Sequence, residues 1–132
     1  WRNSELGEVF DMKIYPIKDD IYNADIYVIP KCTPEDLIKF FKRKYKYAYE
    51  HDATYGAFHY QLSEPDKGWT HHFLVFDAFE NSPSGIGQFN HELLHLVSSI
   101  MRIRCLKHIE ETEEAYAYYM GYLTERILEK IC

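Results

Sequence analysis

The residues with the clearest chemical potential are His91, Glu92 and His95, which form an H-E-x-x-H motif. In an α-helix, positions four apart differ by about 40° in direction and by roughly 6 Å along the axis. Two imidazoles at this spacing can converge on one Zn²⁺ ion. Glu92 lies one step round the helix, where its carboxylate suits the water on the metal better than the metal itself. The motif therefore predicts a zinc site with Glu92 as its general base.

A catalytic zinc site needs a third protein ligand and an open fourth position. Several glutamates lie close together downstream of the motif, and Glu114 has the most suitable position among them. Glu114 shares a predicted helix face with the small residues Ala117 and Gly121, which would let this helix approach the motif helix closely. We therefore predict Glu114 as the third ligand. Glu113, which points about 100° away, is the alternative.

The elements that position these side chains follow from apolar periodicity, turn residues and helix caps. These patterns predict strands at 9–17, 24–29, 54–62 and 70–79, a loop at 81–87, and helices at 33–50, 87–105 and 111–131. Glu64-Pro65-Asp66-Lys67-Gly68 predicts a hairpin turn between the third and fourth strands. The fourth strand is apolar on both sides, so both of its faces should be covered. This order of elements favours an α+β domain with a small, mostly antiparallel sheet.

The motif and its downstream segment together resemble the gluzincin metallopeptidases. H-E-x-x-H, eighteen residues and then Glu114 match the H-E-x-x-H-x₁₈-E pattern of that group, and Glu114-x-x-Ala117 is similar to its third-ligand segment. The stretch 117–122 is more similar to small zincin-like proteins encoded by bacteriophages and prophages. Tyr118 stands where many gluzincins have Asp or Asn. The resemblance covers about residues 86–128.

This resemblance implies a single minimal zincin-like domain over residues 1–132, a Zn²⁺ cofactor and hydrolysis of a peptide or protein substrate. In the implied mechanism, Glu92 takes a proton from the zinc-bound water and passes it to the leaving amine. An extra donor would stabilise the oxyanion. The sequence leaves six candidates for this donor, with Tyr118 first: Tyr118, Tyr119, Tyr122, His59, His71 and His72. Residues 54–62 or 70–78 would form the strand that pairs with an extended substrate.

Composition limits the other functional classes. The chain is 46% hydrophobic, which excludes disorder as its overall state, and its net charge of −6 argues against a nucleic-acid-binding face. The basic stretch Lys42–Lys46 is therefore predicted to be a solvated helix face. No apolar run reaches the roughly 20 residues that cross a bilayer, so no membrane partner is expected.

Three scattered cysteines favour a reducing, cytoplasmic compartment, although the chain does not begin with Met and a removed leader stays open.

One alternative to a peptidase stays open at this point. A chain of 132 residues has little room for the second lobe that usually walls a peptidase cleft. In this alternative, the protein is a zincin-fold binding or assembly protein in which zinc is structural or vestigial. The sequence predicts neither the cleavage specificity nor the oligomeric state.

Overall fold

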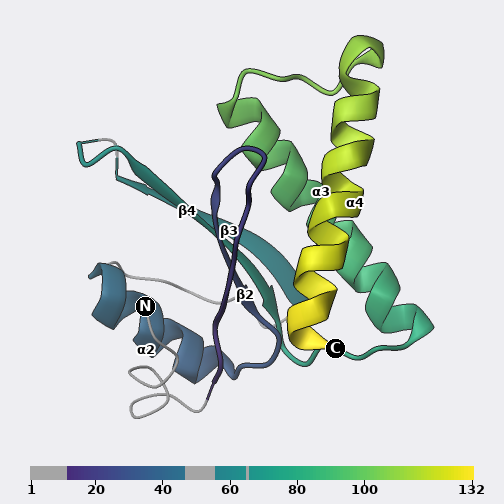
Figure 1. Cartoon of the computed structure of the whole chain (residues 1–132). Coiled ribbons are helices and arrows are strands. Elements are labelled where there is room, and N and C mark those ends of the chain that lie inside the picture. The colour runs from purple at the N-terminus through teal and green to yellow at the C-terminus, as the bar shows by residue number, and fades with distance from the viewer. Residues whose placement is uncertain (1–11, 47–55, 65) are drawn as a thin grey trace.

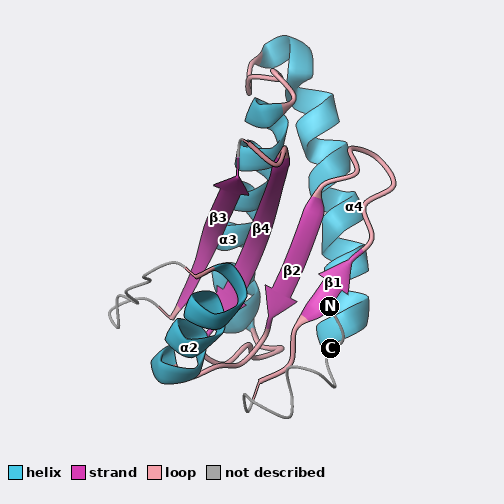
Figure 2. Ribbon diagram, turned by 90° about the vertical axis from the view of Figure 1, so that its left-hand side faces the viewer, coloured by secondary structure: helices cyan, strands magenta, loops and turns pink. Residues whose placement is uncertain are grey.

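A computed structural model describes residues 12–46, 56–64 and 66–132 of the chain. The strands are β1 (Tyr15–Ile17), β2 (Asp25–Ile29), β3 (Ala57–Glu64) and β4 (Trp69–Phe76), and the helices are α2 (Pro34–Tyr45), α3 (Pro83–Ile103) and α4 (Glu113–Ile131), with a 3₁₀ turn, η1 (Glu110–Thr112), before α4. Helix α2 covers one face of the sheet, and α3 and α4 cover the other (Figures 1 and 2). The predicted α+β class and the predicted order of elements are confirmed.

The sheet formed by the described strands is mixed, with the order β1-β2-β4-β3. The β1–β2 and β3–β4 pairs are antiparallel, as predicted for most of the sheet, whereas β2 and β4 are parallel. The parallel pair arises because α2 and β3 form a long connection between these two strands, as parallel neighbours require. The predicted β3–β4 hairpin is confirmed. Within the described sheet, β4 is an inner strand and β3 is an edge strand.

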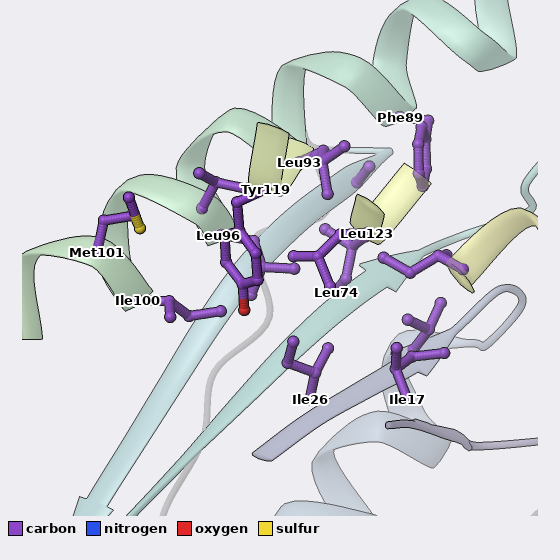
Figure 3. Packing of buried hydrophobic residues seen from close by; sticks show 14 of the residues in the cluster. Ile17, Ile26, Leu74, Phe89, Leu93, Leu96, Ile100, Met101, Tyr119 and Leu123 are labelled. Carbon is purple, nitrogen blue, oxygen red and sulfur yellow. The ribbon is translucent and has the colours of Figure 1, made fainter. Parts of the chain in front are cut away.

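Two apolar clusters pack against opposite faces of β4, because alternate side chains of a strand point to opposite sides. The cluster facing α3 and α4 includes Leu74, Phe76, Phe89, Leu93, Leu96, Tyr119 and Leu123, most of which Figure 3 shows. The cluster facing α2 includes Phe73, Val75, Leu37, Phe40 and Phe41. Both faces of β4 are thus covered, as its apolar run predicts. None of the helices in the described ranges has the length and apolarity that crossing a bilayer requires.

Helix α3, which carries the motif, begins at Pro83 rather than at the predicted residue 87. Ser82 caps it, because its Oγ accepts a hydrogen bond from the backbone N–H of Gly85 at 3.1 Å, and a proline suits the first helical position. Gly85 is needed in this turn, since a Cβ there would lie 1.9 Å from the carbonyl oxygen of Glu80. The prediction of a loop up to residue 87 is therefore wrong.

The other boundaries differ less from the predictions. Helix α2 ends at Tyr45, because Lys46 adopts a left-handed backbone conformation with φ of 58°. The predicted continuation of that helix to Glu50 lies outside the described residues, as does the beginning of the predicted first strand. Lys42 and Arg43 are exposed in the last turn of α2, as expected for a solvated face.

Buried Asp19 connects the β1–β2 loop to α4. Its Oδ1 accepts hydrogen bonds from the backbone N–H groups of Ile21 and Tyr22, at 3.0 and 3.2 Å. Its Oδ2 accepts from the backbone N–H of Ala24 at 3.0 Å and from the Tyr119 hydroxyl at 2.6 Å. One carboxylate therefore satisfies four donors, at a position that is 5% exposed.

Replacement of Asp19 by Ala is expected to lower the free energy of unfolding by about 3 kcal/mol, because it leaves several buried donors without an acceptor. Tyr119→Phe removes only one of these hydrogen bonds and should cost about 1 kcal/mol. Chemical denaturation followed by circular dichroism measures both values. Equal destabilisation by the two variants would contradict this role of Asp19.

Candidate active site

The buried face of α3 determines where the motif points. Phe89, Leu93 and Leu96 are fully buried against the sheet and α4. His91 and His95 lie on a neighbouring face of the helix and are exposed. The side chain of His91 is 69% exposed, whereas that of Glu92 is 13% exposed. The motif thus presents two accessible imidazoles beside a shielded carboxylate.

The separation of the two histidines is compatible with binding of one metal ion. Their ring centroids lie 5.0 Å apart, with an angle of 69° between the ring planes. A tetrahedral Zn²⁺ ion at about 2.0–2.1 Å from one nitrogen of each ring would hold the centroids roughly 5 Å apart. Glu92 Oε1 lies 3.8 Å from His91 Nε2, so the carboxylate stands beside the pair. Helix α3 therefore brings together the three residues that the motif predicts.

These side chains line a cavity of about 480 Å³ between α3 and the edge of the sheet. Strand β3 contributes Ala57, Phe58 and His59, and α3 contributes Arg102 besides the motif. Strand β3 is an edge strand of the described sheet, so no described strand pairs with its outer side. Of the two strands predicted to border a cleft, β3 lines this cavity, whereas β4 lies inside the described sheet and contributes none of the lining residues.

His59 faces the cavity from the sheet and is hydrogen-bonded to His72 on β4. The distance from His59 Nε2 to His72 Nδ1 is 3.3 Å, and the two rings are stacked at 15°. Burial is the main cause that lowers the pKa of each ring to about 4. Nearby groups add to the shift: His72, His95 and Arg102 for His59, and His71 and Arg104 for His72. Both imidazoles are therefore neutral near pH 7.

The metal-free protein should lose stability as the pH falls from about 6.5 to about 4. The unfolded chain protonates both histidines near their ordinary pKa of 6.5, whereas the folded chain does so only near 4. The unfolded state binds more protons in this range, so the stability present above pH 6.5 is lost by at most about 1.4 kcal/mol per pH unit for each histidine. Denaturation midpoints between pH 7 and 4 measure the slope. His59→Gln should make it shallower, and an unchanged slope would contradict the assignment.

The structure does not bring Glu114 to the histidines. Helix α4 buries Tyr116, Tyr119, Leu123 and Ile127. Glu114, Ala117 and Gly121 lie on its exposed side, as does the alternative ligand Glu113. The predicted packing of the small-residue face against α3 is therefore wrong. Helix α4 packs over the β1 side of the sheet, whereas the cavity lies at β3 (Figure 2).

As a result, only part of the predicted ligand set is assembled. His91 and His95 stand together, but within the described ranges no group of three or more His, Cys, Asp or Glu side chains is placed to hold a metal ion. The histidine pair fits a divalent cation, and the set as it stands lacks a third ligand.

Of the six candidate oxyanion donors, only His59 lines the described cavity. Tyr118 is 67% exposed on α4 and does not reach it. Hydrogen bonds hold Tyr119 to Asp19, Tyr122 to Lys18 and Asp20, and His71 to Tyr45. The assignment of Tyr118 as oxyanion donor is therefore not supported by its position.

Arg102 is the cavity residue that the sequence analysis missed. It follows His91 by eleven positions, which is close to three helical turns, so the two residues lie on the same side of α3. Arg102 lies about 10 Å beyond His95 along the helix axis. It gives one end of the cavity a positive charge. The extension of the His91 and His95 spacing to position 102 is the signal that could have identified it.

The cavity thus combines two exposed imidazoles, a shielded carboxylate and a neutral imidazole on an edge strand, with a cation at one end. Comparisons of the chain with protein-family models, with curated proteins and with solved structures gave no match. The chemistry available to this site therefore follows from these side chains.

Proposed function

We propose that this chain is a zinc-dependent peptide hydrolase with a zincin-like arrangement of sheet and helices. The observation that supports this most strongly is that His91, Glu92 and His95 open into one cavity beside an edge strand. His91 and His95 would hold the metal ion. When bound, Zn²⁺ supplies a Lewis acid for the substrate carbonyl and acidifies its water.

The other residues of the cavity have roles that follow from their chemistry. Glu92 would accept a proton from water and deliver it to the leaving amine. The edge strand β3 would bind an extended peptide through backbone hydrogen bonds, in the manner of an added strand. Arg102, at one end of the cavity, would favour a substrate with an acidic side chain at the matching position. The proposed substrate is therefore an extended peptide segment.

A second candidate function is a binding or assembly protein that has the same fold without peptidase activity. The exposed position of Glu114 and the lack of a three-residue ligand group among the described residues favour it. The edge of β3 would then bind a strand of a partner protein without cleaving it.

Metal-dependent cleavage tests the proposed function. The full chain is loaded with Zn²⁺, its metal content is measured, and it is incubated with a mixed peptide library. We expect one zinc ion per chain and cleavage that stops with a chelator and returns with added Zn²⁺. Bound zinc without turnover would favour the binding protein, and a chain that binds no zinc would contradict the hydrolase.

The cysteines bear on the proposed compartment. Cys32 is buried, and burial raises its pKa to about 12, whereas Cys105 and Cys132 are exposed free thiols. Exposed free thiols suit a reducing environment. We therefore propose a cytoplasmic location.

A further inference from the structure

We propose that His59, on edge strand β3, is the third protein ligand of the metal ion, and that His72 is the hydrogen-bond partner that orients it. This inference rests on the proposed zinc chemistry of α3. In this assignment His59 of β3 replaces Glu114 of α4 as the third ligand, so the metal ion would bridge α3 and β3.

The cavity itself selects His59. Four of the described residues that line it carry atoms able to bind zinc, namely His59, His91, Glu92 and His95. Glu92 is the neighbour of His91 on the helix and is the candidate general base. His59 stands on the opposite wall, on strand β3. None of the glutamates of η1 or of the first turn of α4 lines this cavity.

The hydrogen bond of His59 to His72 uses one of its two ring nitrogens, Nε2. Histidines that bind metals usually donate their other ring N–H to a second group, which fixes the tautomer and the ring orientation. His59 uses Nε2 for its contact with His72 Nδ1, at 3.3 Å. In the tautomer in which Nε2–H of His59 donates, the lone pair lies on Nδ1. Nδ1 is therefore the nitrogen of His59 that can bind a metal ion.

His72 is held rigidly enough to orient its neighbour. It is 2% exposed and lies on β4, the inner strand that pairs with both β2 and β3. Among the described residues, the side chain of His72 has one hydrogen-bond partner, which is His59. A buried polar side chain on an inner strand usually satisfies a specific partner. If His72 orients His59 on the neighbouring strand, this role explains why an imidazole is buried at position 72.

Closure of the ligand set requires side-chain rotation. Within the described residues the three rings do not yet form a metal-binding group. The side chain of His91 is 69% exposed and His95 is also exposed, so both can rotate toward β3 without loss of core packing. The cavity of about 480 Å³ has room for this movement and for an ion. Metal binding should therefore close the site while the backbone stays in place.

The experiment measures Zn²⁺ affinity of the full chain by competition with a chromophoric chelator. His59→Ala is compared with Glu114→Gln and with His108→Ala, which removes an exposed histidine that does not line the cavity. We expect His59→Ala to weaken Zn²⁺ binding about 100-fold, and both other variants to stay within about 2-fold of the parent chain. His72→Asn should weaken binding about 10-fold or more, through the orientation of His59. Circular dichroism verifies folding, and His59→Gln is measured in case His59→Ala does not fold.

The outcomes separate this inference from the proposed function. If the parent chain binds Zn²⁺ and neither His59 variant changes its affinity, His59 is not a ligand and the hydrolase proposal stands. Weaker binding by Glu114→Gln alone would return the third ligand to α4. Unchanged affinity with lost turnover in His59→Ala would make His59 an oxyanion donor and overturn the ligand assignment. A parent chain without Zn²⁺ affinity would overturn both proposals.

Discussion

Replacement of Glu92 by Gln is expected to lower kcat for peptide hydrolysis about 10³-fold, while Zn²⁺ affinity and stability stay unchanged. The amide has the shape of the carboxylate but cannot accept a proton from water near pH 7. The side chain of Glu92 is 13% exposed and lines the cavity beside His91. Among the described residues, no other carboxylate lines that cavity, so none is placed to accept the proton instead. Steady-state cleavage of a fluorogenic peptide, with the zinc content measured on the same samples, gives the comparison.

The matched control for this variant is Glu110→Gln, which makes the same chemical change at an exposed residue of η1. It should leave kcat unchanged. Turnover by Glu92→Gln at the rate of the parent chain would show that Glu92 is not the general base. Loss of zinc together with turnover would instead assign Glu92 to metal binding.

His95→Ala is expected to weaken Zn²⁺ binding about 100-fold and to abolish the metal-dependent cleavage. It removes one of the two imidazoles whose ring centroids lie 5.0 Å apart, and a single helix histidine cannot fix the ion. Structural zinc sites with four ligands bind with roughly 10–16 kcal/mol, which corresponds to about 3 kcal/mol for each ligand. Competition with a chromophoric chelator measures the affinity.

Asn90→Ala is the control, because Asn90 is exposed on α3 next to the motif and does not line the cavity. The affinity of this variant should equal that of the parent chain. If His95→Ala also retained full Zn²⁺ affinity, the histidine pair would not be the metal site.

Local features of the site could be predicted from the sequence. The spacing of His91 and His95 depends only on the geometry of one helix, and α3 forms with these residues on one accessible side. The start of α3 was also encoded locally by Ser82 and Pro83. It was missed because the glycines that follow are typical of a loop, whereas Gly85 permits a close approach of the chain.

The position of Glu114 does not follow from the geometry of one helix, because it depends on which face of α4 packs inward. Two faces competed: one with small residues beside Glu114, and one with Tyr116, Tyr119 and Leu123. Burial of large side chains removes far more apolar surface from water than burial of Ala or Gly, so the second face packs inward. The sequence contained this information, since the aromatic face carries most of the apolar area.

The environment of His59 depends on strand order, which is a long-range property. The parallel pairing of β2 with β4 places β3 at the edge of the described sheet and next to α3. The apolar character of both sides of residues 70–79 already favoured an inner position for that strand. The sequence could therefore predict that β3, and not β4, is the outer strand. It could not predict that β3 lies next to α3.

The most direct measurement is anomalous X-ray scattering at the zinc edge from crystals of the zinc-loaded chain. An anomalous peak is expected between α3 and β3, about 2.0–2.1 Å from one ring nitrogen of His91 and one of His95. The absence of a peak between these rings, or a peak at another place in the molecule, would contradict the assignment of this cavity as a zinc site.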